Sequence, residues 1–262
     1  MSDAAGGGGT GRRTALVTGA SSGIGAAIAI ALGALGWSVA IGARRSDRLG
    51  EVASRIVDAG GGGFAHVLDV SEPSSIEAFF AAAERELGPI DVVVSNAGVG
   101  VPGRLQDLDV EDLRHEITTN LLGPMLVARR AIPSMIERGR GDVVFITSLN
   151  AVSPRPLQIG YTASKSGLEG AARTLRMELE GTGVRSTIIR PGPTRTDFGT
   201  GWADETVSEI LDSWKHWGVL RHMQTLPAES VAAAVVAVVT APPGTHLDEI
   251  QINPEGPVQR NE

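Results

Sequence analysis

The chain has 262 residues, no cysteine and a formal net charge of −7 at pH 7. Its length suits one large α/β domain with a substantial core, and a hydrophobic content of 42% argues against disorder throughout. The lack of cysteine excludes disulfides and thiolate catalysis, which fits a reducing cytoplasm. The negative charge, without a basic cluster above the background, argues against nucleic acid as a partner.

Residues 1–12 are small, polar and rich in glycine, and they lack the apolar core of a signal peptide. We interpret them as a flexible tail and predict a single domain over residues 13–262. The longest apolar run, residues 231–239, is too short to span a bilayer, which takes ~20 residues. These features predict a cytoplasmic protein that does not associate with membranes.

Residues 14–18 form a short apolar strand that leads into a glycine-rich turn and then into a small-residue helix over residues 26–35. Strand, glycine turn and helix are the context of a dinucleotide-binding fingerprint. The glycines permit a tight turn and close backbone approach to a pyrophosphate, which the helix N-terminus then favours. An ordinary turn is the alternative. The predicted phosphate-binding residues are Gly19, Ser21, Ser22, Gly23, Ile24 and Gly25.

The second predicted strand, over residues 38–43, ends without an acidic residue and is followed by Arg44 and Arg45. An Asp or Glu at this place would hold a ribose 2′-hydroxyl, whereas an arginine can make bidentate contacts with a 2′-phosphate. The two arginines therefore favour NADP(H) over NAD(H), with Arg44 providing most of the discrimination. The alternative is that one or both are solvated loop charges.

Two further strands, predicted over residues 64–70 and 90–95, end in residues that would lie beside such a cofactor. Asp69, followed by Val70, could accept a hydrogen bond from an adenine amino group. Its alternative role is in the N-cap region of the next helix. The later strand is followed by a small-residue turn that lets a flat cofactor approach, consisting of Asn96, Ala97 and Gly98.

A long helix, interrupted near its middle, is predicted over residues 109–136. Asn120 lies just before Gly123-Pro124, where the proline removes a backbone donor and can kink the helix. An asparagine at such a break could hold a water in the site, or it could be only a polar position within a helix.

Tyr161, the only tyrosine of the chain, lies four residues before Lys165, so in a helix the two side chains share one face. A free phenol has a pKa near ~10. An ammonium nearby favours the phenolate and lowers that pKa, which would let Tyr161 exchange a proton near physiological pH. Ser148 ends an apolar strand over residues 143–147 and can donate a hydrogen bond to a substrate carbonyl. Without a cofactor nearby, an exposed helix pair is the better interpretation.

A sixth strand over residues 185–190 runs into Pro191-Gly192. A last helix over residues 227–240 and a seventh strand over residues 247–252 complete the pattern. Strands that alternate with helices predict a parallel sheet covered on both faces, which is a Rossmann-type, doubly wound α/β fold of seven strands.

Together these motifs resemble those of the short-chain dehydrogenase/reductases of the compact, single-domain kind, over roughly residues 13–254. The glycine turn matches the cofactor motif of that family, and Asn96-Ala-Gly98 matches its sheet-stabilising motif. Pro191-Gly192 matches the motif that closes over the nicotinamide, with Thr194 and Thr196 close behind. The catalytic tetrad of the family is matched in order by Asn120, Ser148, Tyr161 and Lys165.

The resemblance implies hydride transfer between NADP(H) and a carbonyl or secondary alcohol in one Rossmann-fold catalytic domain. Tyr161 would be the general acid in reduction and the base in oxidation, and Lys165 would lower its pKa and hold the nicotinamide ribose. Ser148 would polarise the carbonyl, and Asn120 would position a water in a proton relay. We assign no metal ligands.

By the same resemblance, the segment of about residues 193–226 is a substrate lid. Its tryptophans indicate an apolar or ring-bearing substrate, with core or interface packing as the alternative. The helices over residues 109–136 and 162–180 resemble those that pair subunits in the family, which implies a homo-oligomer, most simply a tetramer. Two other functions stay open, namely an NADP(H)-binding regulator with little turnover and a dehydratase or epimerase on the same scaffold.

Overall fold

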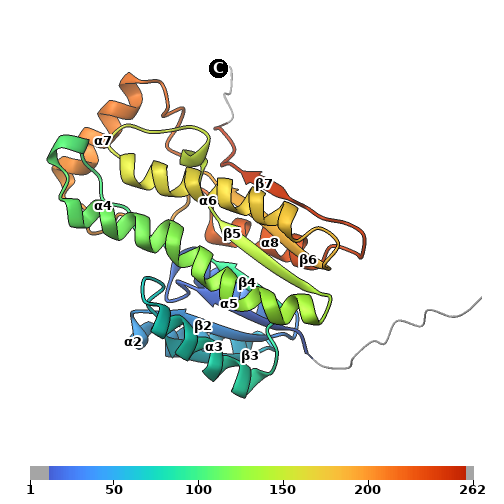
Figure 1. Cartoon of the computed structure of the whole chain (residues 1–262). Helices are drawn as coiled ribbons and strands as arrows, with labels where there is room; N and C mark the ends of the chain where they lie inside the picture. Colours follow the sequence, from blue (N-terminus) through green and yellow to red (C-terminus); the bar gives the residue numbers. More distant parts are fainter. Residues whose placement is uncertain (1–11, 258–262) are drawn as a thin grey trace, which may run out of the picture.

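A seven-stranded parallel sheet forms the centre of the protein, in a computed structural model that describes residues 12–257 (Figure 1). The strand order is β3-β2-β1-β4-β5-β6-β7. This arrangement confirms the predicted Rossmann-type fold; the predicted tail lies, except for Arg12, outside the described residues. The strands are β1 (Thr14–Thr18), β2 (Ser38–Ala43), β3 (Gly62–Val67), β4 (Val92–Ser95), β5 (Gly141–Ile146), β6 (Val184–Pro191) and β7 (Glu249–Ile252).

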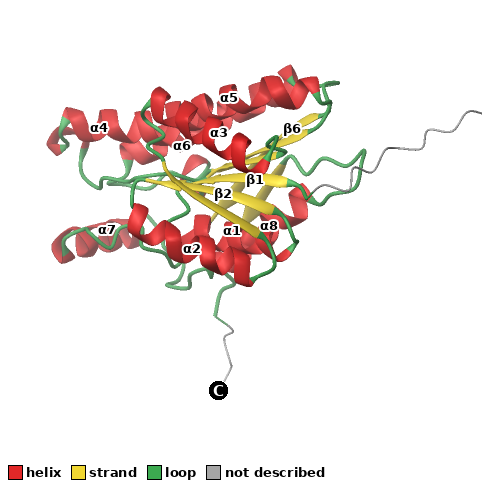
Figure 2. Ribbon diagram, turned by 90° about the horizontal axis from the view of Figure 1, so that it is seen from below, coloured by secondary structure: helices red, strands yellow, loops and turns green. Residues whose placement is uncertain are grey.

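Helices cover both faces of the sheet, as Figure 2 shows. One layer holds α3 (Pro73–Leu87), α5 (Gly123–Glu137) and α6 (Ile159–Glu178), with α4 (Val110–Ile117) projecting beyond the sheet. The opposite layer holds α1 (Gly23–Ala34), α2 (Ser46–Asp58) and α8 (Ala228–Val239), and α7 (Asp204–His216) extends from it on the same side as α4. Within residues 12–257, no helix has the length and apolar character needed to cross a membrane.

The strands are apolar because both of their faces are buried. In β1, Leu16 packs into the core beneath α3, α5 and α6, whereas its neighbours Ala15 and Val17 pack into the core on the opposite face. The side chains of a strand alternate between the two faces, so a run of small and branched apolar residues fills both cores at once.

The polar ends of the strands gather at one edge of this sheet. β1 pairs with β2 on one side and with β4 on the other, so the strand order reverses between β1 and β4. In open α/β sheets, ligands bind at the carboxyl ends of the strands beside such a reversal. The segments after β1, β2, β4, β5 and β6 therefore form the candidate site.

Several boundaries differ from the prediction, and two of the differences affect the site. Strand β3 begins within the glycine run and ends at Val67, which leaves Asp69 two residues beyond the strand. Helix α6 begins at Ile159 rather than at Thr162, so Tyr161 lies in its first turn. The observed start confirms that Tyr161 and Lys165 belong to one helix.

The interruption of the long helix is a π-helical segment, Thr118–Leu122, between α4 and α5. The break lies directly before Gly123-Pro124, as predicted: Pro124, in the first turn of α5, has no N–H to donate to the carbonyls of the preceding turn, which belongs to the π-segment. A π-segment is often found at a functional site because it re-aims side chains within a helix. Here it contains Asn120.

A cluster of buried ion pairs connects α6 to the last two strands. Arg190 binds Glu169 through two hydrogen bonds of 2.7 and 2.6 Å, and Arg173 binds Glu249 through two of 2.6 and 3.0 Å. The Arg173 guanidinium holds the pKa of Glu249 down at about 2. Thr147 also donates a hydrogen bond to Glu169 (2.9 Å), so this cluster reaches the residue next to Ser148.

Candidate active site

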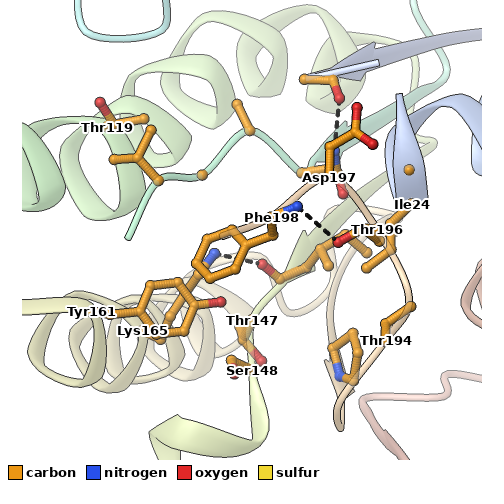
Figure 3. A pocket seen from close by; sticks show the side chains of 18 of the residues that line it. Ile24, Thr119, Thr147, Ser148, Tyr161, Lys165, Thr194, Thr196, Asp197 and Phe198 are labelled. Atoms are coloured by element: carbon orange, nitrogen blue, oxygen red, sulfur yellow. Dashed lines mark hydrogen bonds between the residues drawn. The ribbon is translucent and has the colours of Figure 1, made fainter. Parts of the chain in front are cut away.

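A cleft of about 550 Å³ opens at the carboxyl edge of the sheet. Figure 3 shows part of it, with side chains from α6, from the end of β5 and from the segment after β6. All but two of the predicted site residues line it. Those that do are Gly19, Ser21, Ser22, Gly23, Ile24, Arg44, Arg45, Asp69, Val70, Asn96, Ala97, Gly98, Ser148, Tyr161, Lys165, Pro191, Gly192, Thr194 and Thr196.

The glycine turn is held against the end of β4 by Asn96. The side-chain amide of Asn96 donates to the carbonyls of Thr18 (3.0 Å) and Gly19 (3.1 Å), and the Thr18 hydroxyl accepts the backbone N–H of Asn96 (3.0 Å). Gly19 has a φ of 66°, and a Cβ there would lie 2.7 Å from the Cα of Ala97. Gly25 does not line the cleft because it packs beneath Asn96, where a side chain would collide with the amide. The turn thus needs glycine at both positions.

The two predicted phosphate-binding arginines differ in their surroundings. Arg45 donates to the hydroxyls of Ser21 (3.1 Å) and Ser22 (2.9 Å), so it lies across the glycine turn. Arg44 forms no such bond within the described chain, and its charge acts on Asp69 across the cleft. Both arginines line the cleft and both are exposed to solvent, so their role at a 2′-phosphate stays a prediction beside the alternative of solvated loop charges. Arg44 has the freer guanidinium.

Asp69 lies in the loop before α3 and binds Ser71, but it does not cap the helix, whose N-cap residue is Glu72. One carboxylate oxygen accepts the backbone N–H (2.9 Å) and the hydroxyl (2.6 Å) of Ser71. Burial acts to raise the pKa of Asp69, but the two Ser71 donors and the Arg44 charge outweigh it and hold that pKa below its ordinary value. Asp69 still lines the cleft, with its second oxygen available.

Tyr161 and Ser148 meet at the deep end of the cleft. Burial raises the pKa of Tyr161, and the Ser148 hydroxyl beside it acts in the opposite direction. The Tyr161 ring lies 5.3 Å, between ring centroids, from that of Phe198, which projects from the segment after β6 (Figure 3). The phenol is therefore shielded from water on this side and protonated at neutral pH.

Lys165 lies in the same helix, and its ammonium is buried. Its Nζ donates to the carbonyl of Ile146 (3.0 Å) and lies 5.8 Å from the centroid of the Tyr161 ring. Burial lowers the pKa of Lys165 to about 8. Burial of the phenol dominates the pKa of Tyr161, and Lys165 is not among the groups that act on it in the protein alone, so the lowering of that pKa by Lys165 stays a prediction.

Asn120 is fully buried and does not line the cleft. Its amide nitrogen donates to the carbonyl of Val99 (2.8 Å) and to the hydroxyl of Ser164 (3.1 Å), and its oxygen accepts the backbone N–H of Val99 (2.8 Å). The side chain is thus occupied in joining the loop after β4 to α6.

The aromatic residues of the predicted lid divide into two groups. Phe198, Trp202 and Trp214 line the cleft, and the Phe198 and Trp202 rings pack edge to face with centroids 5.6 Å apart. Trp217 is 68% exposed and lies outside the cleft, so of the predicted roles only interface packing fits this position. His216 and His222 also lie outside it.

Sequence reasoning missed two ionisable residues near Tyr161. Arg155, in the loop before α6, lines the cleft. Glu116, in α4, is fully buried: one oxygen accepts the backbone N–H of Val101 (3.0 Å), and the other has no hydrogen-bond partner in residues 12–257. Burial raises the pKa of Glu116. An acidic residue four positions before Asn120, on its inward face, was the only signal for Glu116 in the sequence.

Comparisons with known proteins agree with this geometry. The short chain dehydrogenase family model matches residues 13–206, and the chain therefore belongs to the short-chain dehydrogenase family of oxidoreductases. It is 40% identical to an uncharacterised oxidoreductase of Mycobacterium tuberculosis over 246 residues, which are 94% of this chain and 92% of the relative. It spans 61% of a short chain dehydrogenase of Pseudocercospora fijiensis (39% identity, 71% of this chain) and 19% of a glycine betaine reductase of Emericella nidulans (34% identity, 92% of this chain).

Solved structures with bound cofactor are similar over almost the whole chain. An alcohol dehydrogenase from Thermococcus sibiricus, complexed with 5-hydroxy-NADP, is 32% identical with a TM-score of 0.80, covering 96% of this chain and 99% of its own. The closed form of a serine dehydrogenase with NADP⁺ is 28% identical with a TM-score of 0.81, covering 95% and 98%.

The raised pKa of Glu116 can be tested through the pH dependence of protein stability. Because its pKa is raised, the folded protein binds more protons here than the unfolded chain does between the ordinary value of 4.5 and the folded pKa. The stability that Glu116 contributes is thus present below that window and is lost as pH rises through it. We therefore compare the unfolding free energy of Glu116→Gln with that of the wild type at about pH 4 and at about pH 8. We expect this difference to move in favour of the variant by about 1–3 kcal/mol from the lower to the higher pH.

Urea unfolding at the two pH values measures this difference. Glu111→Gln, on the exposed side of the same helix, is the matched control and should show no comparable change with pH. A Glu116→Gln effect that is independent of pH, or that favours the wild type as pH rises, would contradict the assignment.

Proposed function

We propose that this protein is an NADP(H)-dependent oxidoreductase that interconverts a carbonyl and a secondary alcohol. The observation that carries the proposal is one cleft in which Tyr161, Ser148 and Lys165 lie together with the glycine turn. A pure sensor of NADP(H) has no need of these side chains, and no contact in the cleft favours a dehydratase or epimerase. Hydride transfer is therefore the preferred function over these two alternatives.

The residues fit a dinucleotide because the glycine turn presents backbone rather than side chains to the cleft. The bound nicotinamide supplies or accepts the hydride. Tyr161 holds a proton at its phenol oxygen and gives it to the carbonyl oxygen during reduction, while the Ser148 hydroxyl donates a hydrogen bond to that same oxygen. The raised pKa of Tyr161 keeps this proton in place at neutral pH.

Lys165 is the cationic residue of the cleft whose pKa lies closest to neutral pH. Its pKa of about 8 leaves it mostly protonated near neutral pH, and Gly98 places no side chain against its buried ammonium: a Cβ there would lie 3.5 Å from Nζ. We assign Lys165 to the nicotinamide ribose and to the proton relay. The water of that relay would be held by the backbone of the π-segment around Asn120.

The walls of the cleft support an apolar or ring-bearing substrate. Phe198 and Trp202 form one side of the opening, and Trp214 forms another. Each indole N–H is already used, that of Trp202 by the carbonyl of Gly100 (3.2 Å) and that of Trp214 by the carbonyl of Pro156 (3.1 Å). These rings therefore present apolar surface to a ligand.

A homo-oligomer is supported by apolar side chains on the outward faces of α4, α5 and α6. Among the described residues, those exposed there and in the π-segment include Ile117, Leu122, Met125, Ile136, Ile159 and Met177. Closed symmetry would bury these faces against copies of themselves, and we propose a tetramer.

The catalytic proposal is tested by Tyr161→Phe, which keeps the ring and removes the proton donor. We expect at least a ~10²-fold loss of kcat, the lower range for general acid–base catalysis, with cofactor binding retained. NADPH absorbance with a panel of ketones and quinones gives the rates. Thr174→Val, which removes an exposed hydroxyl from the same helix, is the control and should be as active as the wild type. Near-normal turnover by Tyr161→Phe would exclude the assigned role.

The cofactor proposal is tested at the end of β2. Hydrogen bonds to charged groups contribute ~1.5–3 kcal/mol, so Arg44→Ala should lower the preference for NADPH over NADH by about ten- to a hundredfold. Arg45→Ala is the matched comparison and should lower it less, because Arg45 is already bonded to Ser21 and Ser22. The measurement is kcat/KM for both cofactors. Equal use of NADH and NADPH by the wild type would show the proposal to be wrong.

The assembly proposal is tested by light scattering at the working concentration. The wild type should have the mass of four chains. Met125→Glu places a charge on the apolar face of α5 and should produce smaller species, whereas Val57→Glu, an exposed apolar position on α2, should not. A wild type with the mass of a single chain would contradict the assembly.

A further inference from the structure

Arg155 is a cation in the cleft that has no role in the proposed catalysis. It lies between Ser148 and Tyr161 in sequence and lines the same cleft as both. Its guanidinium stacks 4.3 Å from the centre of the Trp214 ring. Its Nε is buried without a hydrogen-bond partner, and the whole guanidinium forms no hydrogen bond or ion pair with any residue of the described chain.

An unpartnered guanidinium beside an aromatic wall is costly to the free protein. Arginine stays charged in proteins, so burial lowers the pKa of Arg155 without neutralising it. The Nε is removed from water without a partner, which is unfavourable, and cation–π contact with Trp214 offsets only part of that cost, while the terminal nitrogens stay open to the cleft. Residues that retain such a cost are found where a ligand provides the missing partner.

The loop that carries Arg155 is fixed by contacts from three parts of the chain. The Trp214 indole of α7 donates to the carbonyl of Pro156 (3.1 Å), and the backbone N–H of Gly103 donates to the carbonyl of Leu157 (2.9 Å). Leu157 adopts a left-handed φ of 64°, which is rare for a branched residue and persists only where the surroundings enforce it. The side chain of Gln158 is also held, by Asn150 (2.5 Å). Arg155 is thus presented from a defined position.

The other charged groups that line the cleft are already engaged or lie toward the adenosine end. Asp197 binds Arg48 (2.7 Å), Lys165 binds the carbonyl of Ile146, and Asp69 binds Ser71. The only charge interaction that bears on Arg155 is with Tyr161, so no carboxylate of the described residues neutralises it. The positive charge of this end of the cleft is therefore available to a ligand.

We propose that Arg155 binds a carboxylate carried by the substrate, so that the enzyme acts on an oxo acid or hydroxy acid with an apolar or ring-bearing body. This inference rests on the proposed function, since it places the reacting carbonyl at Tyr161 and Ser148. The planar guanidinium matches a carboxylate through two parallel hydrogen bonds. One guanidinium balances one negative charge, whereas a phosphate dianion would leave a second charge unpaired beside Trp214 and Trp202.

The test is a calorimetric titration that does not depend on turnover. The protein with excess NADP⁺ is titrated with phenylacetate and with phenylacetamide, which have the same shape and differ in charge, and with phenyl phosphate. We expect phenylacetate to bind roughly tenfold or more tightly than the amide, the scale of a charged hydrogen bond, and more tightly than phenyl phosphate. Arg155→Gln should abolish the preference, and Arg155→Lys should keep a smaller one.

Arg114→Gln, an exposed arginine on α4 outside the cleft, is the matched control and should keep the full preference. Equal binding of phenylacetate and phenylacetamide by the wild type would overturn the proposal whether or not the variants fold. Tighter binding of phenyl phosphate, or a preference that persists in a folded Arg155→Gln, would also overturn it. Failure of the proposed function would instead appear as no NADPH oxidation with any carbonyl, and the titration would still decide the role of Arg155.

Discussion

The side-chain amide of Asn96 joins the two strands between which the strand order reverses, and the cofactor end of the site depends on it. By donating to the carbonyls of Thr18 and Gly19, it holds the glycine turn against the end of β4. A Cβ at Gly25 would lie 2.5 Å from the amide nitrogen, and a Cβ at Gly19 would lie 2.7 Å from the Cα of Ala97, so neither position admits a side chain. The backbone N–H groups of Gly19 and Ala20 also donate to the carbonyl of Gly42, so the turn is held from β2 as well as from β4.

The catalytic end of the cleft depends on a second polar cluster, on the other side of the reversal. Glu169 is buried in α6 and binds Arg190 and Thr147. Thr147 immediately precedes Ser148, and Arg190 immediately precedes Pro191-Gly192. Breaking a buried, hydrogen-bonded ion pair by removing one partner is costly. The cluster therefore restrains the two chain segments that carry Ser148 and Pro191-Gly192 into the cleft.

Between these two clusters the protein keeps ionisable groups in surroundings that disfavour their charged forms. Burial raises the pKa of Tyr161, lowers that of Lys165 and leaves Arg155 without a partner. Glu116, behind Tyr161, is buried with one oxygen unsatisfied. Each of these groups reduces the stability of the free protein. Groups with perturbed pKa values gather where a ligand or a reacting proton completes their interactions.

The sequence by itself determined the fold and most of the residues that line the cleft. Alternating apolar strands and helices specify a parallel sheet, and the carboxyl ends of its strands meet at one edge, so short motifs after each strand must converge. Only the tertiary structure decided how individual side chains are used. Asn120 joins two segments instead of facing the cleft, and Trp217 is exposed although Trp214 is not. The upward shift of the Tyr161 pKa likewise follows from its burial in the folded chain. Spacing along the chain records local geometry, whereas burial and partners depend on residues far away in the sequence.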